Sequence, residues 1–319
     1  MPEEFLVQQR KRADAHADAC TSKCRPIIVV GAERSGTSVV AEMVRRWGAY
    51  AGEPEKLRKG DEHNPQGYWE YTPIWDFLVE LGDFAEGASW WDASFQERVK
   101  EKASIPQYRE KAQSLVGTMK KQGRPWVWKD PALSFFLPFW REIWRDPVYI
   151  ITVRNPYDIA VSWQKFVLPP EQEGALNLIA GNLLRWQYMM LLVLEHTDDA
   201  EGKLFMPFEG LMRAPKTHAK RLSEFLDRSC ADKTSDEMRV EQMSGVVNPR
   251  LWRNRANIPF SRVHEAANEQ KALYQFLGKK TEDPLTKLNI TDYQMPADWR
   301  DVIKNDEAHR RTRLQHETG

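Results

Sequence analysis

Cysteine is scarce in this chain, and its scarcity excludes one class of protein. Only three cysteines occur in 319 residues, too few for the disulfide framework that holds small secreted domains together. Cys20 and Cys24 are close in sequence but have no third or fourth ligand nearby, so they make a poor metal site. We therefore expect a protein of a reducing compartment that requires no metal.

Net charge is missing as well. Lys and Arg total 46 and Asp and Glu total 46, so the formal net charge is zero. Without an excess of positive charge we expect no nucleic-acid partner. The proportions of apolar residues, 41%, and charged residues, 29%, are those of a soluble globular protein.

Long hydrophobic runs are the third absence. Residues 1–25 are rich in charge and lack the apolar core of a signal peptide. The longest apolar stretch with helical spacing, 183–194, is interrupted by Arg185 and Gln187 and is too short and too polar to cross a bilayer. We expect a cytoplasmic protein with no membrane partner.

The patterns that are present alternate between short β-branched or aromatic runs and longer stretches with helical spacing. This alternation predicts an α/β protein whose central parallel sheet is flanked by helices on both faces. Residues 25–295 are expected to form one domain, between a polar tail or helix at 1–24 and a charged tail at 296–319. The expected strands are 27–30, 126–129, 148–153 and 204–206, and the expected helices are 39–47, 73–81, 94–121, 131–144, one opening at Asn155-Pro156, 174–195 and 215–226.

The strongest local signal is GAERSGTS at 31–38, between the first expected strand and the first helix. Two glycines five residues apart let a backbone wrap around an anion, and the helix N-terminus supplies N–H groups. A nucleotide triphosphatase loop would carry Lys where Thr37 stands, whereas Arg34 lies inside this loop and can bind an anion. The alternative is a glycine-containing turn without a ligand.

The second signal is RNPYDIAVS at 154–162. Arg154 ends an expected strand, where open α/β sheets place their ligands. Asn155 and Ser162 are seven residues apart and so share one face of the following helix. Arg154 and Ser162 together predict a pocket for one phosphate, the alternative being a surface Arg–Asp pair and a helical Ser that faces the backbone.

Together the two motifs resemble the sulfotransferases that use 3′-phosphoadenosine 5′-phosphosulfate (PAPS), whose product is PAP. The resemblance covers about 26–226, including Trp128-Lys129-Asp130-Pro131 and Phe208-Glu209-Gly210-Leu211. It is nearest to the branch with G-x-x-R-S-G-T loops, which includes tyrosylprotein and bacterial carbohydrate or small-molecule enzymes. It implies a fold like that of the P-loop nucleotide hydrolases.

The resemblance also implies roles for particular residues. The 5′-phosphosulfate would lie in the first loop, and the 3′-phosphate would be bound by Arg154 and Ser162. Lys129 would be catalytic and, with Arg34, would contact the phosphosulfate. Arg253 and Arg255 lie in a late basic cluster that would complete the 3′-phosphate site, although the family's Arg-Lys-Gly motif is absent; a solvated basic face is the equal alternative. The loop residues assigned to donor binding are Glu33, Arg34, Ser35, Gly36, Thr37 and Ser38.

The expected reaction is in-line transfer of a sulfuryl group to a hydroxyl or amine of a small-molecule or saccharide acceptor, and no oligomeric state is predicted. It needs a base for the acceptor proton, and the candidates are Glu70, then His63, then Glu62, the alternative for each being a solvated loop charge. The nearby Trp69, Trp75, Trp90 and Trp91 either form the acceptor wall or pack the core, whereas the four-residue spacing of Trp140 and Trp144 favours the core.

Two rival functions remain. A P-loop kinase or nucleotide hydrolase would need the missing loop Lys and a carboxylate for Mg²⁺. A catalytically silent PAP-binding protein would keep the nucleotide site without turnover, and the presence of Arg34, Lys129, Arg154 and Ser162 disfavours it.

Overall fold

The computed structural model describes residues 25–83, 95–167, 178–230, 237–255 and 257–282. The two expected tails, 1–24 and 296–319, lie outside these residues, as do Cys20, Cys24, Trp90 and Trp91.

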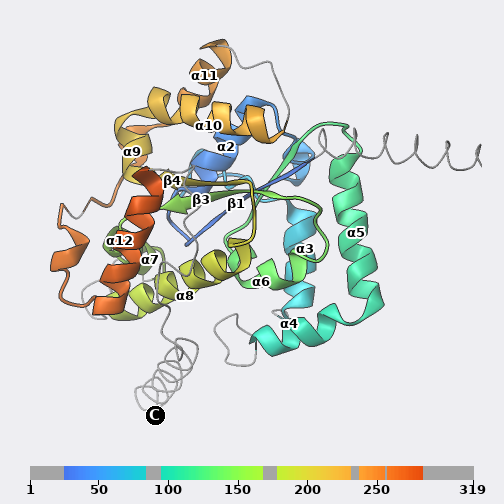
Figure 1. Ribbon diagram of the computed structural model, residues 1–319, viewed down its shortest axis with the longest axis horizontal. Helices are drawn as coiled ribbons and strands as arrows, with labels where there is room; N and C mark the ends of the chain where they lie inside the picture. Colours follow the sequence, from blue (N-terminus) through green and yellow to red (C-terminus); the bar gives the residue numbers. More distant parts are fainter. Residues whose placement is uncertain (1–24, 84–94, 168–177, 231–236, 256, 283–319) are drawn as a thin grey trace, which may run out of the picture.

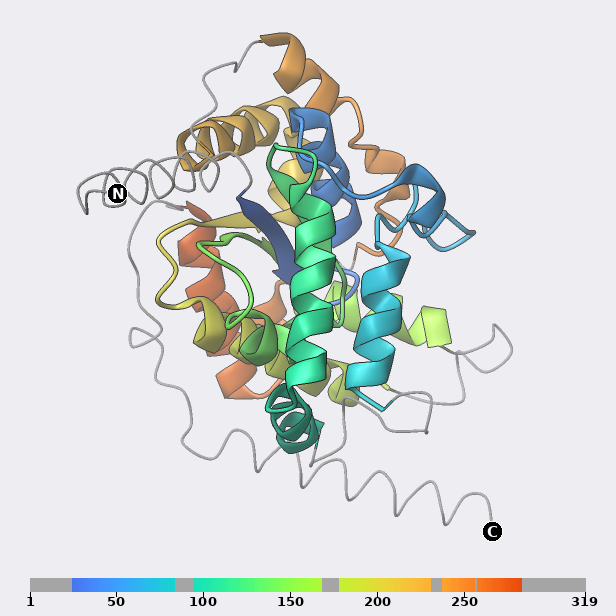
Figure 2. The ribbon, with the colours of Figure 1, turned by 90° about the vertical axis from the view of Figure 1, so that its right-hand side faces the viewer.

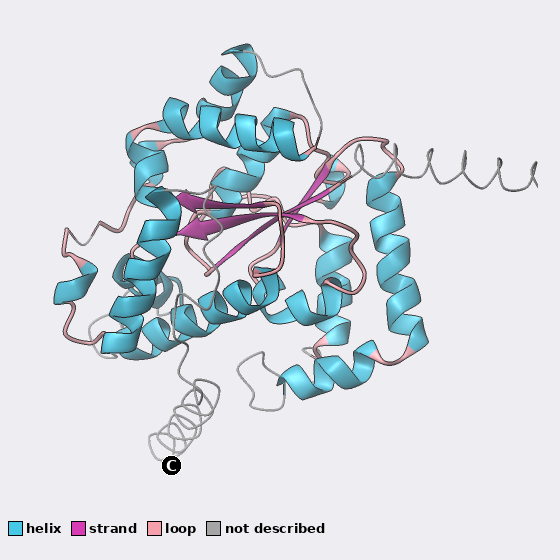
Figure 3. Cartoon of the chain, in the orientation of Figure 1, coloured by secondary structure: helices cyan, strands magenta, loops and turns pink. Residues whose placement is uncertain are grey.

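The centre of the molecule is a four-stranded sheet with the order β2-β1-β3-β4, in which all neighbouring strands are parallel (Figure 3). The bounds are Pro26–Gly31 for β1, Trp126–Lys129 for β2, Val148–Val153 for β3 and Lys203–Pro207 for β4. Every residue of β1, β2 and β3 is buried, which explains why these strands appear in the sequence as continuous apolar runs. The expected α/β class with a parallel sheet is confirmed.

Helices cover both faces of the sheet (Figure 1). The bounds of the helices are Thr37–Trp47 (α2), Thr72–Leu81 (α3), Phe95–Ala103 (α4), Pro106–Lys120 (α5), Leu133–Trp140 (α6), Pro156–Val167 (α7), Ile179–Thr197 (α8), Phe208–Arg213 (α9), Pro215–Ser229 (α10), Glu237–Ser244 (α11) and Asn268–Glu282 (α12), with short 3₁₀ turns at Pro54–Lys56 (η1), Pro249–Leu251 (η4) and Phe260–Arg262 (η5). Figure 2 shows α5 in front of the sheet, beside α3.

Alternate residues of β1 belong to different hydrophobic clusters. Ile27 and Val29 belong to the cluster shared with α2, α9, α10 and α11. Ile28 and Val30 belong to the cluster shared with α3 to α6, α8 and α12.

Tryptophan fills much of the core beside β2. The rings of Trp140 and Trp144 are stacked, with centroids 5.6 Å apart and planes 14° apart. Trp128 packs edge-on against Trp140 at 4.4 Å. The expectation that Trp140 and Trp144 pack the core is confirmed, since their exposures are 0% and 5%.

The helix expected at 174–195 begins outside the described residues and is described as α8, and in two other helices the bounds differ for a local reason. The stretch expected as one helix at 94–121 is divided into α4 and α5, because Pro106 forces the preceding Ile105 into an extended conformation. The helix expected at 131–144 is shorter in the structure, beginning at Leu133 and ending at Trp140. Its start is preceded by a turn in which Asp130 accepts a hydrogen bond from the Ala132 N–H. Helix α9 has no counterpart among the elements expected from the sequence.

Within the described residues we find no helix with both the length and the apolarity that crossing a membrane requires. Cys230 is buried, with 3% of its surface exposed.

Candidate active site

A cleft of about 700 Å³ lies where the strands of the sheet end. Its walls are formed by the loop after β1, the segment 58–70 and the end of β2. The segment that runs from Arg154 into α7, the helix α9 and residues 245–254 also form part of them. Parallel strands bring their carboxyl ends to one edge, so segments far apart in sequence meet there. Of the predicted site residues, the cleft is lined by Glu33, Arg34, Gly36, Thr37, Ser38, His63, Glu70, Lys129, Arg154, Ser162 and Arg253.

The loop after β1 has a left-handed backbone at two points. Arg34 has φ 64°, and Gly36, which precedes α2, has φ 93°. A Cβ atom on Gly36 would lie 2.4 Å from Cδ2 of Phe208, so only glycine fits without movement. Ser35 does not line the cleft: its buried hydroxyl bonds to the Ala32 carbonyl and to Oγ1 of Thr152. The Ser35 side chain therefore holds the loop to β3.

Two arginines from distant parts of the chain meet beside this loop. Arg154, directly after β3, donates from Nη1 to the carbonyl oxygen of Arg34 at 2.7 Å. Arg34 in turn donates from Nε to Oγ of Ser162 at 3.1 Å. The structure thus brings together the two motifs that the sequence separates by about 120 residues.

Arg154 is 6% exposed, and the hydrogen bonds that its side chain makes to described residues all go to backbone carbonyls. Its Nη2 donates to the Asn254 carbonyl at 2.9 Å, and its guanidinium lies 4.6 Å from the centre of the Phe208 ring. Its buried Nε has no hydrogen-bond partner among the described residues. Burial lowers the pKa of Arg154 to about 10. A buried cation with an unused donor is a favourable place for an anion.

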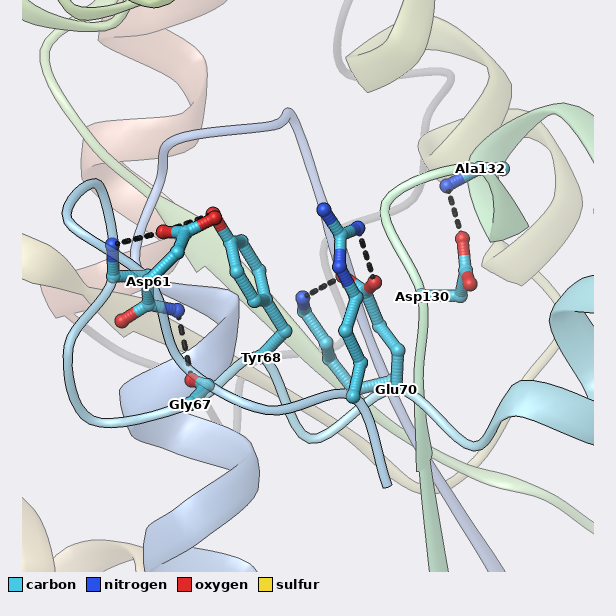
Figure 4. A network of polar contacts seen from close by, with 9 residues as sticks. Asp61, Gly67, Tyr68, Glu70, Asp130 and Ala132 are labelled. Atoms are coloured by element: carbon cyan, nitrogen blue, oxygen red, sulfur yellow. Dashed lines mark hydrogen bonds and ion pairs between the residues drawn. The ribbon is translucent and has the colours of Figure 1, made fainter. Parts of the chain in front are cut away.

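An ion-pair network around the buried carboxylate of Glu70 lies at the end of β2 (Figure 4). Nζ of Lys129 donates to Oε1 of Glu70 at 2.7 Å, and both side chains are 3% exposed. Nη1 of Arg58 donates to the other oxygen, Oε2, at 2.9 Å. Both oxygens of Glu70 therefore accept hydrogen bonds from cations.

The segment carrying Glu70 is held by a second set of contacts. Asp61 accepts a hydrogen bond from the hydroxyl of Tyr68 (Figure 4). It also accepts hydrogen bonds from the N–H groups of His63 and Asn64. Arg58 lies 4.1 Å from the centre of the Tyr68 ring, and its N–H donates to the Glu70 carbonyl at 2.8 Å. These contacts fix the backbone that places Glu70 against Lys129.

His63 and Glu62, the other two candidate bases, lie in different surroundings. His63 lines the cleft with its ring edge-on to Phe166 at 4.9 Å, and Arg34 lies 5.4 Å from the same Phe166 ring. The side chain of Glu62 is 86% exposed and does not line the cleft. The structure therefore brings His63 close to the loop after β1 and leaves the Glu62 side chain outside the cleft.

The two predicted basic residues near the C-terminus, Arg253 and Arg255, differ in whether they line the cleft. Arg253 lines the cleft and donates to the Glu62 carbonyl at 2.9 Å. Burial lowers the pKa of Arg34, and the positive charge of Arg253 lowers it further. The two cations are therefore close enough to repel each other. Arg255 lies against Trp252 at 4.2 Å, bonds to the Pro249 carbonyl and does not line the cleft.

Aromatic side chains form part of the wall. Trp69 and Trp75 line the cleft, together with Trp163 and Phe166 of α7, and each of the first two also packs against a hydrophobic cluster of the core. Arg45 lies 4.7 Å from the centre of the Trp69 ring.

Several residues that matter for the geometry were missed by the sequence analysis: Arg58, Asp61, Tyr68, Phe166, Arg185 as an ion-pair partner, and Asn254. Arg58 and Glu70 meet because Leu57 and Tyr71 form an antiparallel bridge. A twelve-residue separation inside a Gly- and Pro-containing loop gives no periodic signal for such a pairing. Within the described part of the chain, no group of three or more His, Cys, Asp or Glu side chains is arranged to hold a metal ion.

Solved structures of three sulfotransferases are similar to this chain. The sulfotransferase domain of the Synechococcus PCC 7002 olefin synthase is 17% identical to this chain in sequence and has a TM-score of 0.42. The match covers 86% of this chain and 97% of that domain. Sulfotransferase STF9 from Mycobacterium avium is 16% identical, at a TM-score of 0.42, with 73% and 71% covered. Sulfotransferase STF1 from Mycobacterium tuberculosis H37Rv is 14% identical, at a TM-score of 0.39, with 85% and 79% covered.

The search of curated proteins gave no match. The model of the sulfotransferase family matches residues 26–232, which contain the first loop, Lys129 and the 154–162 motif. Arg253 and Asn254 of the cleft lie beyond the matched residues. Because the match covers more than half of the sequence, the chain belongs to the sulfotransferase family.

Proposed function

We propose that the cleft binds PAPS and that the protein transfers its sulfuryl group to a hydroxyl or amine of a small-molecule or saccharide acceptor. The observation that carries this proposal is the contact between two cations, the half-buried Arg34 and the buried Arg154, in which Arg154 donates a hydrogen bond to the Arg34 carbonyl. Two cations this close repel each other. An anionic ligand offsets that repulsion.

The residues present fit a donor with two anionic ends. The N–H groups at the start of α2, with Arg34 and Lys129, would hold the 5′-phosphosulfate. Arg154, with its unpartnered Nε, would hold the 3′-phosphate together with Ser162 and Arg253. In this proposal Glu33 and Ser35 contribute backbone groups, because the carboxylate of Glu33 is paired with Arg185 and the hydroxyl of Ser35 is bonded within the loop. Arg255 keeps at most an indirect role through Trp252.

The donor supplies an activated sulfuryl group, and the chain supplies charge and a proton acceptor. Lys129 and Arg34 are placed to stabilise negative charge that grows on the leaving phosphate. Glu70, within 2.7 Å of Lys129, is our first choice to take the acceptor proton, with His63 as its competitor and Glu62 third. The aromatic wall would orient the acceptor.

The two rival functions differ from this proposal at named residues. A kinase or nucleotide hydrolase would place a loop Lys where Thr37 begins α2. A silent PAP-binding protein would not need Lys129 and Glu70 paired inside the cleft. Both rivals make measurable predictions.

Titration calorimetry with PAP, ADP and GTP, without Mg²⁺, tests the donor. PAP is expected to bind far better than ADP or GTP. Arg154→Ala removes charged hydrogen bonds worth about 1.5–3 kcal/mol, so PAP should bind roughly ten- to a hundred-fold more weakly. As a control, Arg141→Ala removes a pair with the exposed Asp199 and should leave binding unchanged.

Equal affinity for PAP and ADP would contradict the proposal that PAPS is the donor. Transfer of labelled sulfate from PAPS to a panel of alcohols, phenols and amines then separates an enzyme from a silent binding protein.

A further inference from the structure

The donor loop contains a carboxylate, which is unexpected in a site for anions. Glu33 is 8% exposed and lines the cleft between Ala32 and Arg34. Burial raises the pKa of Glu33, and the charge of Arg185, together with smaller contributions from Arg34 and Lys129, opposes that rise. An ionised Glu33 left without a partner would repel a phosphosulfate in the same loop.

Arg185 of α8 removes this conflict by forming an ion pair with Glu33. The side chains of Arg185 and Glu33 are only 16% and 10% exposed, so solvent screens their interaction weakly. The Arg185 guanidinium also lies 3.8 Å from the centre of the Trp163 ring. Arg185 is thus fixed from two directions, by Glu33 in the donor loop and by α7.

The contact between Arg185 and Trp163 connects Arg185 to the wall of the cleft. Trp163 follows Ser162 in α7, lines the cleft and packs against Phe166 at 5.3 Å. Phe166 is the ring beside which Arg34 lies. Arg185 therefore contacts Glu33 directly and reaches Arg34 through Trp163 and Phe166, although it does not itself line the cleft.

We propose that Arg185 is a positioning residue for the donor: it neutralises Glu33 so that the loop presents only N–H groups and the Arg34 cation to an anion. This inference rests on the proposed function. A buried ion pair adds little net stability by itself, but loss of one partner leaves an uncompensated charge. In this site that charge would be negative and would lie in the wall of an anion-binding cleft.

The test compares PAP affinity among charge variants at about pH 7 and at about pH 9, where a carboxylate deprived of its cation is more fully ionised. Arg185→Met should weaken PAP binding about ten-fold or more, with the larger loss at the higher pH. Arg185→Lys keeps the charge and should restore most of the affinity. The double variant Glu33→Gln/Arg185→Met should return close to the wild-type affinity.

Arg239→Met is the matched control. Arg239 pairs with Asp227 at 3.3 Å, with side-chain exposures of 18% and 12%, and lies 5.4 Å from the centre of the Trp47 ring. It therefore repeats a half-buried pair beside a tryptophan, away from the cleft. The control variant should lose stability without losing PAP affinity.

The outcomes separate this inference from the proposed function. If the wild-type protein prefers PAP but Arg185→Met binds it equally well at both pH values, Arg185 is only structural. If the wild-type protein does not bind PAP, both proposals fail. If Arg185→Met does not fold, Glu33→Gln carries the test: tighter PAP binding supports the inference, and equal or weaker binding overturns it.

Discussion

At the residue scale, the pairing of Lys129 with Glu70 is informative because both side chains are 3% exposed. Two charges in such a place are held by each other and by Arg58 rather than by water. Lys129 consequently has one defined position at the end of β2. Such preorganisation is what stabilisation of a leaving group requires.

We expect Lys129→Met to lower kcat by about 10²–10³-fold, since removal of one preorganised donor usually has an effect of this size. PAP affinity should stay substantial, because Arg34 and Arg154 remain. Single-turnover sulfate transfer and PAP calorimetry measure the two effects separately. Near-wild-type turnover would restrict Lys129 to a structural role.

The base is tested by Glu70→Gln, His63→Asn and Glu62→Gln, assayed with one responsive acceptor. Loss of a general base should lower the rate by about 10²–10⁴-fold while PAP binding persists. We expect this loss for Glu70→Gln, and Glu62→Gln serves as the exposed control. A large loss for His63→Asn, with most turnover kept in Glu70→Gln, would move the role to His63.

Sequence and structure agree on the residues whose position follows from strand ends. Arg34 and Arg154 each follow a buried strand, and parallel pairing of β1 with β3 brings such positions together. Arg58 and Arg185 could not be assigned in this way. Arg58 reaches Glu70 across an irregular loop, and Arg185 interrupts an apolar helix in a pattern that also fits a solvated charge.

At the scale of elements, the turn from β1 into α2 depends on Gly36. The φ of 93° and the proximity of Phe208 together exclude a Cβ atom. The turn is thus held by α9, an element that the sequence analysis did not predict. Element boundaries were harder to predict than the elements, because Pro106 and Asp130 act locally to break or delay helices.

Gly36→Ala should destabilise the protein by at least about 1–2 kcal/mol, the cost of a left-handed conformation for a residue with a Cβ atom. PAP affinity should fall as the loop shifts. Gly117→Ala in α5 is the matched control: apart from the nearby backbone of α5, no atom of the described residues lies within 4 Å of its added Cβ, and the change should stabilise the helix by about 0.5–1 kcal/mol. Urea unfolding of both variants measures the difference, and equal stabilities would contradict the strain argument.

At the scale of the whole molecule, stability should depend on pH through His218 of α10. Burial, followed by the nearby charge of Arg221, lowers the pKa of His218. As the pH falls from about 7 to about 5, the unfolded chain binds a proton that the folded protein resists, so the free energy of unfolding falls.

His218→Gln should lose less stability over this range than the wild-type protein, because the carboxylates titrate equally in both. Urea unfolding at several pH values gives the comparison. Parallel pH profiles for the two proteins would show that His218 does not contribute.

The stacked pair Trp140–Trp144 has an optical consequence. Two indole rings 5.6 Å apart and nearly parallel are close enough for their electronic transitions to couple, which gives a circular dichroism signal that depends on their mutual orientation. Neither ring lines the cleft, whereas Trp69, Trp75 and Trp163 do. The core and the cleft therefore carry separate chromophores: the coupled signal reports whether the sheet is packed, and ligand-induced changes in emission report on the cleft.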